Sequence, residues 1–195
     1  MPGTVPIPTP LYRIIHIQNV EYILRNGIYT NGHIKRDPNY VNIGDTQLIA
    51  HRNDHPVKLE GYGNLGDYVP FYFGPHSPML YKIRTGNGVT QFPQSDIVYF
   101  IVNAQSLIHE EVRFVFTNGH AKNNFTEFYT DLNDLSEIDW EVVYLRKWNN
   151  TIDNMDRMRR KQAEFLIHGH VPINLIDRIV VYNQEKFNFV ETLLR

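Results

Sequence analysis

The sequence contains no cysteine and no long apolar run, and both absences narrow what the protein can be. Without cysteine it has no disulfide framework, no thiolate metal site and no cysteine nucleophile. No stretch approaches the roughly 18 uncharged apolar residues that a membrane span requires, and the N-terminal segment lacks a secretory signal pattern. We therefore expect a soluble, cytoplasmic protein that has no membrane partner.

Several common catalytic and metal-binding motifs are also missing. The chain has no phosphate-binding P-loop, no dinucleotide-binding glycine fingerprint and no G-x-S-x-G nucleophile elbow around Ser77. Two histidine pairs, His51 with His55 and His168 with His170, have no third ligand at a convincing spacing. The sequence therefore predicts that the protein binds no metal.

Positive and negative charges nearly balance, but the positive ones are unevenly distributed. The formal net charge is −2, so any affinity for nucleic acid has to come from a local patch. One such patch is possible between positions 146 and 161, and it consists of Arg146, Lys147, Arg157, Arg159, Arg160 and Lys161. These residues form either a solvated helix face or a nucleic-acid-binding surface, beside which exposed aromatic rings could stack on unpaired bases.

Short segments rich in aromatic and β-branched residues dominate the chain. They predict strands over residues 11–16, 67–73, 97–102, 113–117, 164–168 and 178–182. Short helices are predicted between an N-cap at Asn19 and a stop at Gly27, over residues 47–52, and near residues 132–135 and 144–148. Many short strands with few long helices indicate an α+β fold, and the length of 195 residues favours one domain over residues 1–195.

A long polar segment separates the first predicted strand and helix from the second strand. From residue 30 to about residue 66 apolar periodicity fades while Gly, Asn, Asp and Pro accumulate. A loop of this length is uncommon inside a compact domain and is usually functional. We therefore expect part of the functional site to come from this segment.

Glu164 is the most informative single residue, because it stands at the start of a strongly apolar strand. The two-residue period of a strand places Gln162, Glu164, Leu166 and His168 on one face and Ala163, Phe165 and Ile167 on the other. A buried carboxylate is costly unless it is paired or has a role in a cleft. The alternative is an edge strand on which Glu164 faces water.

Gln162-x-Glu164 is also how many ADP-ribosyltransferases present their catalytic glutamate, and other segments extend the similarity. They are residues 8–20, residues 67–73 with 77–81, residues 114–117 with Gly119 and His120, residues 138–140, and residues 161–168. Taken in order, from residue 8 to about residue 182, these segments resemble the DarT family of DNA ADP-ribosyltransferase toxins.

The resemblance implies an ADP-ribosyltransferase-like fold, with two small, mostly antiparallel sheets flanking an NAD-binding cleft and with short helices. It implies transfer of ADP-ribose from NAD⁺ to a base of single-stranded DNA, with thymine favoured and guanine possible. NAD⁺ would then be a substrate, and cleavage of its glycosidic bond passes through an oxocarbenium-like state that a carboxylate stabilises. The resemblance also implies a macrodomain antitoxin similar to DarG as a partner.

The same resemblance assigns residues to the site. Glu164 matches the catalytic glutamate and Arg52 the essential arginine of the family, and the residues that match the NAD⁺ pocket are Arg13, Ile14, Ile15, Tyr22, Thr30 and Arg52. The loop of residues 31–53 would close over NAD⁺, and residues 121–161, which contain the basic patch, would recognise the substrate. Because an arginine keeps its proton at physiological pH, we assign proton removal to Glu164 and electrostatic support to Arg52.

The opening strand departs from the family pattern at two positions. Arg13 stands where the family commonly has a histidine, and Ile15 replaces a threonine. Either the cofactor contact differs there or the Arg13 guanidinium replaces the histidine, and the change is compatible with another target base. Two alternatives also remain at this point: an ADP-ribosyltransferase that acts on RNA or protein, and a catalytically inactive nucleic-acid-binding module.

Overall fold

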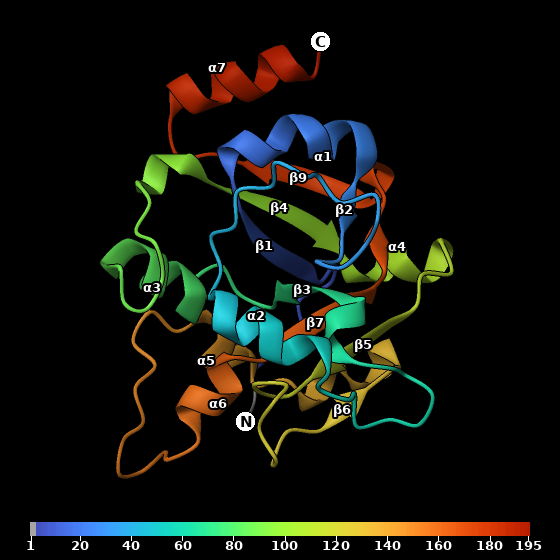
Figure 1. Cartoon of the computed structure of the whole chain (residues 1–195). Helices are drawn as coiled ribbons and strands as arrows, with labels where there is room; N and C mark the ends of the chain where they lie inside the picture. Colours follow the sequence, from blue (N-terminus) through green and yellow to red (C-terminus); the bar gives the residue numbers. More distant parts are fainter. Residues whose placement is uncertain (1–2) are drawn as a thin grey trace.

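A large antiparallel sheet and a small one form the framework of the computed structural model, which describes residues 3–195 (Figure 1). The seven-stranded sheet has the order β6-β5-β7-β3-β1-β4-β9, and β2 pairs with β8 in the second sheet. The strands are β1 (Pro10–His16), β2 (Ile28–Tyr29), β3 (Tyr68–Tyr72), β4 (Ile97–Asn103), β5 (Phe114–Thr117), β6 (Phe128–Tyr129), β7 (Glu164–His168), β8 (His170–Val171) and β9 (Ile176–Val180). The predicted α+β class with antiparallel pairing is confirmed.

Short helices connect and cover these strands. The α-helices are α1 (Val20–Asn26), α2 (Thr46–Asn53), α3 (Pro78–Thr85), α4 (Ala104–His109), α5 (Trp140–Tyr144), α6 (Arg157–Lys161) and α7 (Gln184–Leu193). The 3-10 helices are η1 (Ile17–Asn19), η2 (Leu65–Asp67), η3 (Gln94–Asp96), η4 (Leu132–Glu137) and η5 (Ile173–Leu175). No helix within residues 3–195 combines the length and the apolar character needed to span a bilayer.

The large sheet divides into two halves between β1 and β3. β1 pairs with β4 along its whole length, from Pro10 opposite Asn103 to His16 opposite Ile97, but it meets β3 at Tyr12 opposite Tyr72. Figure 1 shows the group β1, β4 and β9 above the group β3, β7, β5 and β6, with α2 lying across the front of the division. The C-terminal half of β1 therefore borders an opening, which agrees with the predicted pair of sheets beside a cleft.

Aromatic side chains fill the main core. Phe73, Phe116 and Phe165 are fully buried, and Phe165 stacks on Phe114 and Phe116 with ring centroids 4.9 and 5.7 Å apart. Aromatic pairs at such distances contribute about 0.5–1.5 kcal/mol beyond the burial of their area. These contacts fix β5 and β7 side by side, so the strand that begins with Glu164 has a rigid support.

Two predicted elements lie elsewhere in the structure. The helix expected near residues 144–148 is absent, because α5 begins four residues earlier, where the Asp139 carboxylate caps it by accepting from the Val142 N–H at 3.0 Å. The last strand spans Ile176–Val180 and not residues 178–182. Both shifts concern segments whose apolar pattern is short, so the cap and the tertiary contacts determine where each element begins.

Candidate active site

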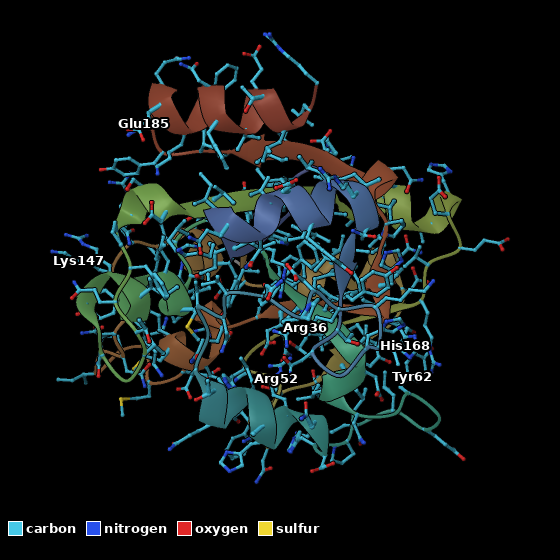
Figure 2. All side chains as sticks on the ribbon, turned by 45° about the horizontal axis from the view of Figure 1, so that its top comes forward. Arg36, Arg52, Tyr62, Lys147, His168 and Glu185 are labelled. Carbon is cyan, nitrogen blue, oxygen red and sulfur yellow. The ribbon has the colours of Figure 1, made fainter. Side chains whose placement is uncertain are left out.

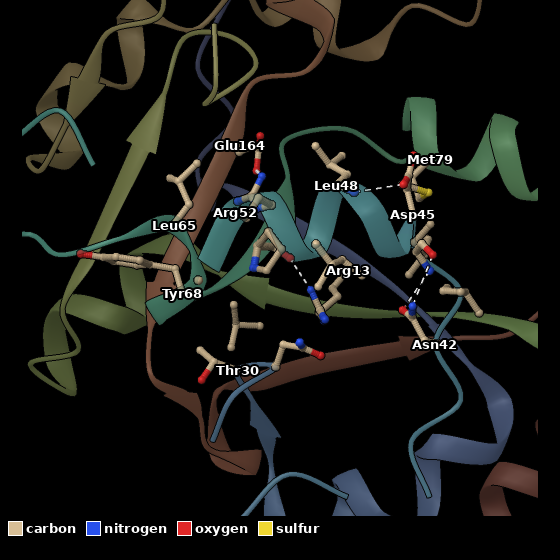
Figure 3. Close-up of a pocket in the computed structure, with 18 of the residues that line it drawn as sticks. Arg13, Thr30, Asn42, Asp45, Leu48, Arg52, Leu65, Tyr68, Met79 and Glu164 are labelled. Atoms are coloured by element: carbon tan, nitrogen blue, oxygen red, sulfur yellow. Dashed lines mark hydrogen bonds and ion pairs between the residues drawn. The ribbon is translucent and has the colours of Figure 1, made fainter. Parts of the chain in front are cut away.

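A cavity opens between the two halves of the sheet, and Glu164 and Arg52 both line it (Figure 3). Its walls come from β1, from the segment after β2, from α2 and β3, and from the beginnings of α3 and β7. The long polar segment predicted to be functional contributes many of the lining residues, from Asn31 to Asn53. The described residues contain no group of three or more His, Cys, Asp or Glu side chains that could hold a metal ion.

Glu164 is buried and fully paired. β7 lies between β5 and β3, so Glu164 is on an interior strand, and 5% of the residue is exposed. Its Oε2 lies 2.8 Å from Arg52 Nη1, and its Oε1 accepts from the Ala121 N–H at 3.2 Å. The Thr117 hydroxyl accepts from the Glu164 main-chain N–H at 3.1 Å. The alternative of an edge strand with a solvated carboxylate is therefore wrong.

The alternation predicted for this strand is largely confirmed. Phe165 and Ile167 belong to the main core, while Leu166 packs into a second cluster on the other face. Gln162 departs from the pattern because it ends α6 as its C-cap and precedes the strand. Gln162 lines the cavity together with Glu164, so the Gln-x-Glu pattern is formed by a helix end followed by a strand.

Arg52 reaches Glu164 from the last turn of α2. The Asp45 carboxylate caps this helix by accepting from the Leu48 N–H at 3.0 Å, and it also pairs with Lys82 of α3 at 3.1 Å. No residue of α2 is buried, so the cap and the contacts at its end, rather than an apolar face, hold it in place. Arg52 Nη2 is buried without a hydrogen-bond partner within residues 3–195, which leaves one donor group for a ligand.

The electrostatic environment of Glu164 includes two further side chains. Tyr72 lies opposite Glu164 in the β3–β7 pairing, and burial, reinforced by the Glu164 charge, raises the pKa of its hydroxyl. Burial lowers the pKa of His120, which also lines the cavity, although the Glu164 charge acts in the opposite direction. Tyr72 and His120 are therefore both neutral at physiological pH, and Glu164 and Arg52 carry opposite charges beside them.

The predicted NAD⁺-binding residues are partly brought together. Arg13, Ile14 and Thr30 line the cavity with Arg52. Arg13 Nη1 donates to the Pro70 carbonyl at 2.8 Å, across the division between β1 and β3, and its Nε is buried without a partner among the described residues. Figure 3 shows the Arg13 and Thr30 side chains on the side of the cavity opposite Glu164.

Two of the predicted pocket residues do not present side chains to this cavity. Ile15 is fully buried in the main core, because its side chain points to the opposite face of β1 from that of Ile14. Tyr22 lies outside the cavity, and its hydroxyl donates to the Lys35 carbonyl at 3.0 Å. Ile15 can act through its main chain alone, and Tyr22 holds the loop that contributes Arg36 and Tyr40 to the wall.

The predicted basic patch is not one surface. Lys161 is 3% exposed, and its Nζ donates to the Val143 and Leu145 carbonyls at 2.6 and 2.7 Å, so it cannot contact DNA. Arg159 pairs with Asp156, and Arg160 pairs with Asp139 and Asp156. The contiguous run is not one surface because Arg159 and Arg160 are paired with carboxylates and Lys161 is buried against main-chain carbonyls.

The remaining members of the patch are accessible. Arg146 and Lys147 are exposed, and Arg157 is half-buried with its Nη1 donating to the Asn149 carbonyl at 3.3 Å. Figure 2 shows Lys147 pointing away from the body of the molecule, whereas Arg52 points inward. Trp148 follows directly and meets the exposed ring of Tyr81 edge to face, with centroids 6.0 Å apart.

Comparison with known proteins agrees with this geometry. The sequence model of the family described as "ssDNA thymidine ADP-ribosyltransferase, DarT" matches residues 12–195. The chain belongs to the DarT family. The family confirms the predicted reaction class, NAD-dependent ADP-ribosyl transfer to DNA, and the alternatives of an RNA- or protein-modifying enzyme or an inactive binding module are not favoured.

Individual DarT relatives match most of the chain. A DNA ADP-ribosyl transferase of Escherichia coli O127:H6 is 41% identical over 176 residues, which are 90% of this chain and 81% of that protein. Thermus sp. 2.9 DarT in complex with ADP-ribosylated ssDNA superposes with a TM-score of 0.91 at 34% identity, over 100% of this chain and 91% of that one. Its complex with NAD⁺ gives a TM-score of 0.85 at 35% identity, over 98% and 90% of the two chains.

A more distant relative joins two activities in one chain. It is a DNA ADP-ribosyl transferase–DNA ADP-ribosyl glycohydrolase fusion protein of Thermosipho africanus. It is 26% identical over 179 residues, which are 90% of this chain and 43% of that protein.

Proposed function

We propose that this protein is a toxin that transfers ADP-ribose from NAD⁺ to a thymine base of single-stranded DNA and releases nicotinamide. The observation that carries the proposal is the ion pair of Glu164 and Arg52 on the wall of one cavity, in which Glu164 Oε2 lies 2.8 Å from Arg52 Nη1. The thymidine named in the family description and the Thermus complex with ADP-ribosylated ssDNA support the choice of acceptor.

NAD⁺ is assigned to the cavity between β1 and α2. Arg13 Nε and Arg52 Nη2 are buried donors without partners in the described part of the chain, and both belong to cavity-lining residues. Guanidinium groups suit the diphosphate of a dinucleotide, because they form paired hydrogen bonds with its oxygens. Arg13 thus makes its own contact with the cofactor at the position where the family commonly has a histidine, and Thr30 and Ile14 complete the wall.

Glu164 has two tasks in the proposed reaction. Its carboxylate stabilises the oxocarbenium-like ribose by accepting from a ribose hydroxyl while the bond to nicotinamide breaks and its electron pair leaves with nicotinamide. It then receives the proton of the attacking thymine nitrogen, whose lone pair forms the new bond to the ribose carbon. Arg52 holds the carboxylate in position through their ion pair.

Single-stranded DNA is assigned to the face that carries Arg146, Lys147 and Trp148. Exposed cations attract the phosphates, and the paired rings of Trp148 and Tyr81 offer a surface on which an unpaired base can stack. Tyr81 belongs to α3, whose first residues, Pro78 and Met79, line the cavity. The DNA would therefore reach the site along α3.

A macrodomain antitoxin similar to DarG is the proposed protein partner. The Thermosipho africanus fusion protein, which combines a transferase with a glycohydrolase, supports the pairing of such a toxin with an enzyme that removes the modification. The test is co-expression, in which a DarG-like glycohydrolase should restore growth of cells that express the chain.

Labelled NAD⁺ tests the proposed acceptor directly. The protein is incubated with NAD⁺ labelled in its adenylate part and with single-stranded DNA, RNA or a protein mixture in separate reactions. We expect label on DNA oligonucleotides that contain thymine and none on the other acceptors. Label on an oligonucleotide that contains guanine but no thymine would overturn the assignment of the base.

A further inference from the structure

His120 is a cavity-lining residue that the proposed reaction does not yet use. It immediately precedes Ala121, whose N–H is the second hydrogen-bond donor to Glu164. His120, Arg52 and Glu164 therefore share one wall, and His120 lies on the segment that positions the carboxylate. Gly119 and His120 belong to the segments of the sequence that resemble the family.

The hydrogen bonds of His120 fix which ring nitrogen carries the proton. Its Nδ1 accepts from the Lys122 main-chain N–H at 3.2 Å, so Nδ1 must present a lone pair. Burial lowers the pKa of the ring, which is therefore neutral at physiological pH and carries its single proton on Nε2. Residues 3–195 provide no hydrogen-bond partner for Nε2, and the residue faces the cavity. The ring of this cavity-lining residue consequently has one N–H donor that no described residue uses.

The segment that carries His120 is held rigidly. The His120 N–H donates to the Arg159 carbonyl at 3.1 Å, and its own carbonyl accepts from the Asn123 N–H at 2.8 Å. Lys58 Nζ binds the carbonyls of Asn123 and Asn124 at 2.8 and 3.0 Å. A donor held in place before the reaction does not have to rearrange when charge develops beside it. This preorganisation is the condition for electrostatic stabilisation of a transition state.

A thymine base needs such a donor. Its N1 is bonded to deoxyribose, so N3 is the nitrogen that can form a new bond, and N3 lies between two carbonyl groups. When N3 gives its proton to Glu164 and its electron pair forms the bond to the ribose carbon, negative charge develops on the two carbonyl oxygens. Tyr72 also has a neutral hydroxyl beside Glu164, but the His120 ring belongs to the residue that directly precedes Ala121, whose N–H already binds the Glu164 carboxylate.

We propose that the Nε2–H of His120 donates a hydrogen bond to one of the two thymine carbonyl oxygens that flank N3, and so makes His120 a catalytic residue for base modification. This inference rests on the proposed function. The His120 proton stays on the ring throughout, while the N3 proton goes to Glu164 and the electron pair of the broken bond goes to nicotinamide. When the accepting oxygen is the one at C4, the donor also favours thymine over cytosine, which has an amino group at C4.

Two substitutions at position 120 separate the donor from the volume of the ring. His120→Leu removes the donor, and His120→Gln restores an N–H group at similar reach. The measurements are kcat for labelling of a thymine oligonucleotide at saturating NAD⁺ and DNA, and Kd for NAD⁺ by calorimetry. We expect His120→Leu to lose about 10²–10³-fold in kcat with Kd changed less than twofold, and His120→Gln to recover at least a tenth of the wild-type kcat.

Each remaining outcome is decisive. Unchanged kcat in His120→Leu, or equal loss in the Leu and Gln variants, would overturn the role of the donor. If His120→Leu does not fold, His120→Ala with added imidazole replaces it, and failure of imidazole to raise kcat would also overturn the proposal. Failure of the wild-type protein to label thymine would instead refute the proposed function, so the two failures are distinguishable.

Discussion

Lys161 is a charged residue that is buried in the protein interior. Its ammonium group lies in the protein interior, and burial lowers its pKa from 10.5 to about 8. Because the folded pKa is the lower one, the unfolded chain binds more protons between pH 8 and about 10. The free energy of unfolding contributed by this residue therefore rises with pH across that window, by at most about 1.4 kcal/mol per pH unit.

A methionine at this position tests that coupling. The Lys161→Met variant has no titratable group at this position. We therefore expect the unfolding free energy of the wild type to rise relative to that of the variant as pH increases from 8 to 9.5. Urea unfolding at several pH values measures it. Lys147→Met is the matched control, because Lys147 is exposed. A difference that does not change with pH would contradict the account of Lys161.

The pair of Glu164 and Arg52 was predictable from the sequence, but the side chains around it were not. Glu164 was predictable because a carboxylate at the start of an apolar strand is unusual, and the family resemblance added Arg52. The buried state of Lys161 was not predictable, since its acceptors are main-chain carbonyls 16 and 18 residues away in the chain. Charge alone cannot distinguish a lysine held by such carbonyls from one that binds phosphate.

Helix α2 is the element on which the position of Arg52 depends. It buries none of its residues, and the Asp45 side chain both caps it and pairs with Lys82. Asp45→Ala should therefore destabilise the protein by about 1 kcal/mol and lower kcat/KM for DNA modification, because α2 loses its fixed start. Asp45→Asn keeps the cap and loses the ion pair. We expect it to retain most of the stability in thermal unfolding, and equal losses in both variants would argue against capping.

Gly66 provides a second, independent test of the same element. A Cβ atom at this position would approach the Cα of Asn53 to 2.6 Å, closer than side chains tolerate. Gly66→Ala should therefore displace the end of α2, carry Arg52 away from Glu164, and reduce kcat about tenfold or more. Gly61→Ala is the comparison on the neighbouring loop, since a Cβ there meets no atom within 4 Å. Because φ at Gly61 is +77°, Gly61→Ala controls for local strain and should leave kcat near the wild-type value.

Among the elements, those with strong local signals were predicted well. The strand predicted over residues 97–102 is one residue shorter than β4 at its C-terminal end. The helix predicted over residues 47–52 is one residue shorter than α2 at both ends. The helix expected near residues 144–148 does not form, because α5 ends at Tyr144 and Lys161 binds the Val143 and Leu145 carbonyls at that end. That tertiary contact leaves no trace in the local sequence.

Across the whole molecule, the proposed DNA-binding face, which carries Arg146, Lys147 and Trp148, has few exposed positive charges. Removing Arg146 and Lys147 together should weaken binding of single-stranded DNA and reduce the slope of log K against log salt by about 1.4, since each phosphate contact contributes about 0.7. Fluorescence anisotropy at several salt concentrations measures the slope. Arg25→Ala with Arg195→Ala is the control, because both arginines are exposed and lie on α1 and at the C-terminus, away from residues 146–148 in Figure 1. Equal slopes in the two double variants would place the DNA elsewhere.

The division of the large sheet could not be predicted from the strand pattern. The resemblance supplied the idea of two sheets beside a cleft, whereas the sequence alone indicated an α+β class. What creates the opening is the short pairing of β1 with β3, which is a property of the whole assembly. The cavity therefore joins residues from position 13 to position 164, and no local pattern could have brought them together.

The central claim is that the Glu164 carboxylate drives transfer of ADP-ribose to a base. Mass spectrometry of a randomised single-stranded oligonucleotide library after incubation with NAD⁺ tests it for the wild type, for Glu164→Gln and for the exposed control Glu185→Gln (Figure 2). We predict that the wild type and Glu185→Gln add one ADP-ribose to thymine, and that Glu164→Gln still binds NAD⁺ but modifies no DNA. Full modification by Glu164→Gln would contradict the account.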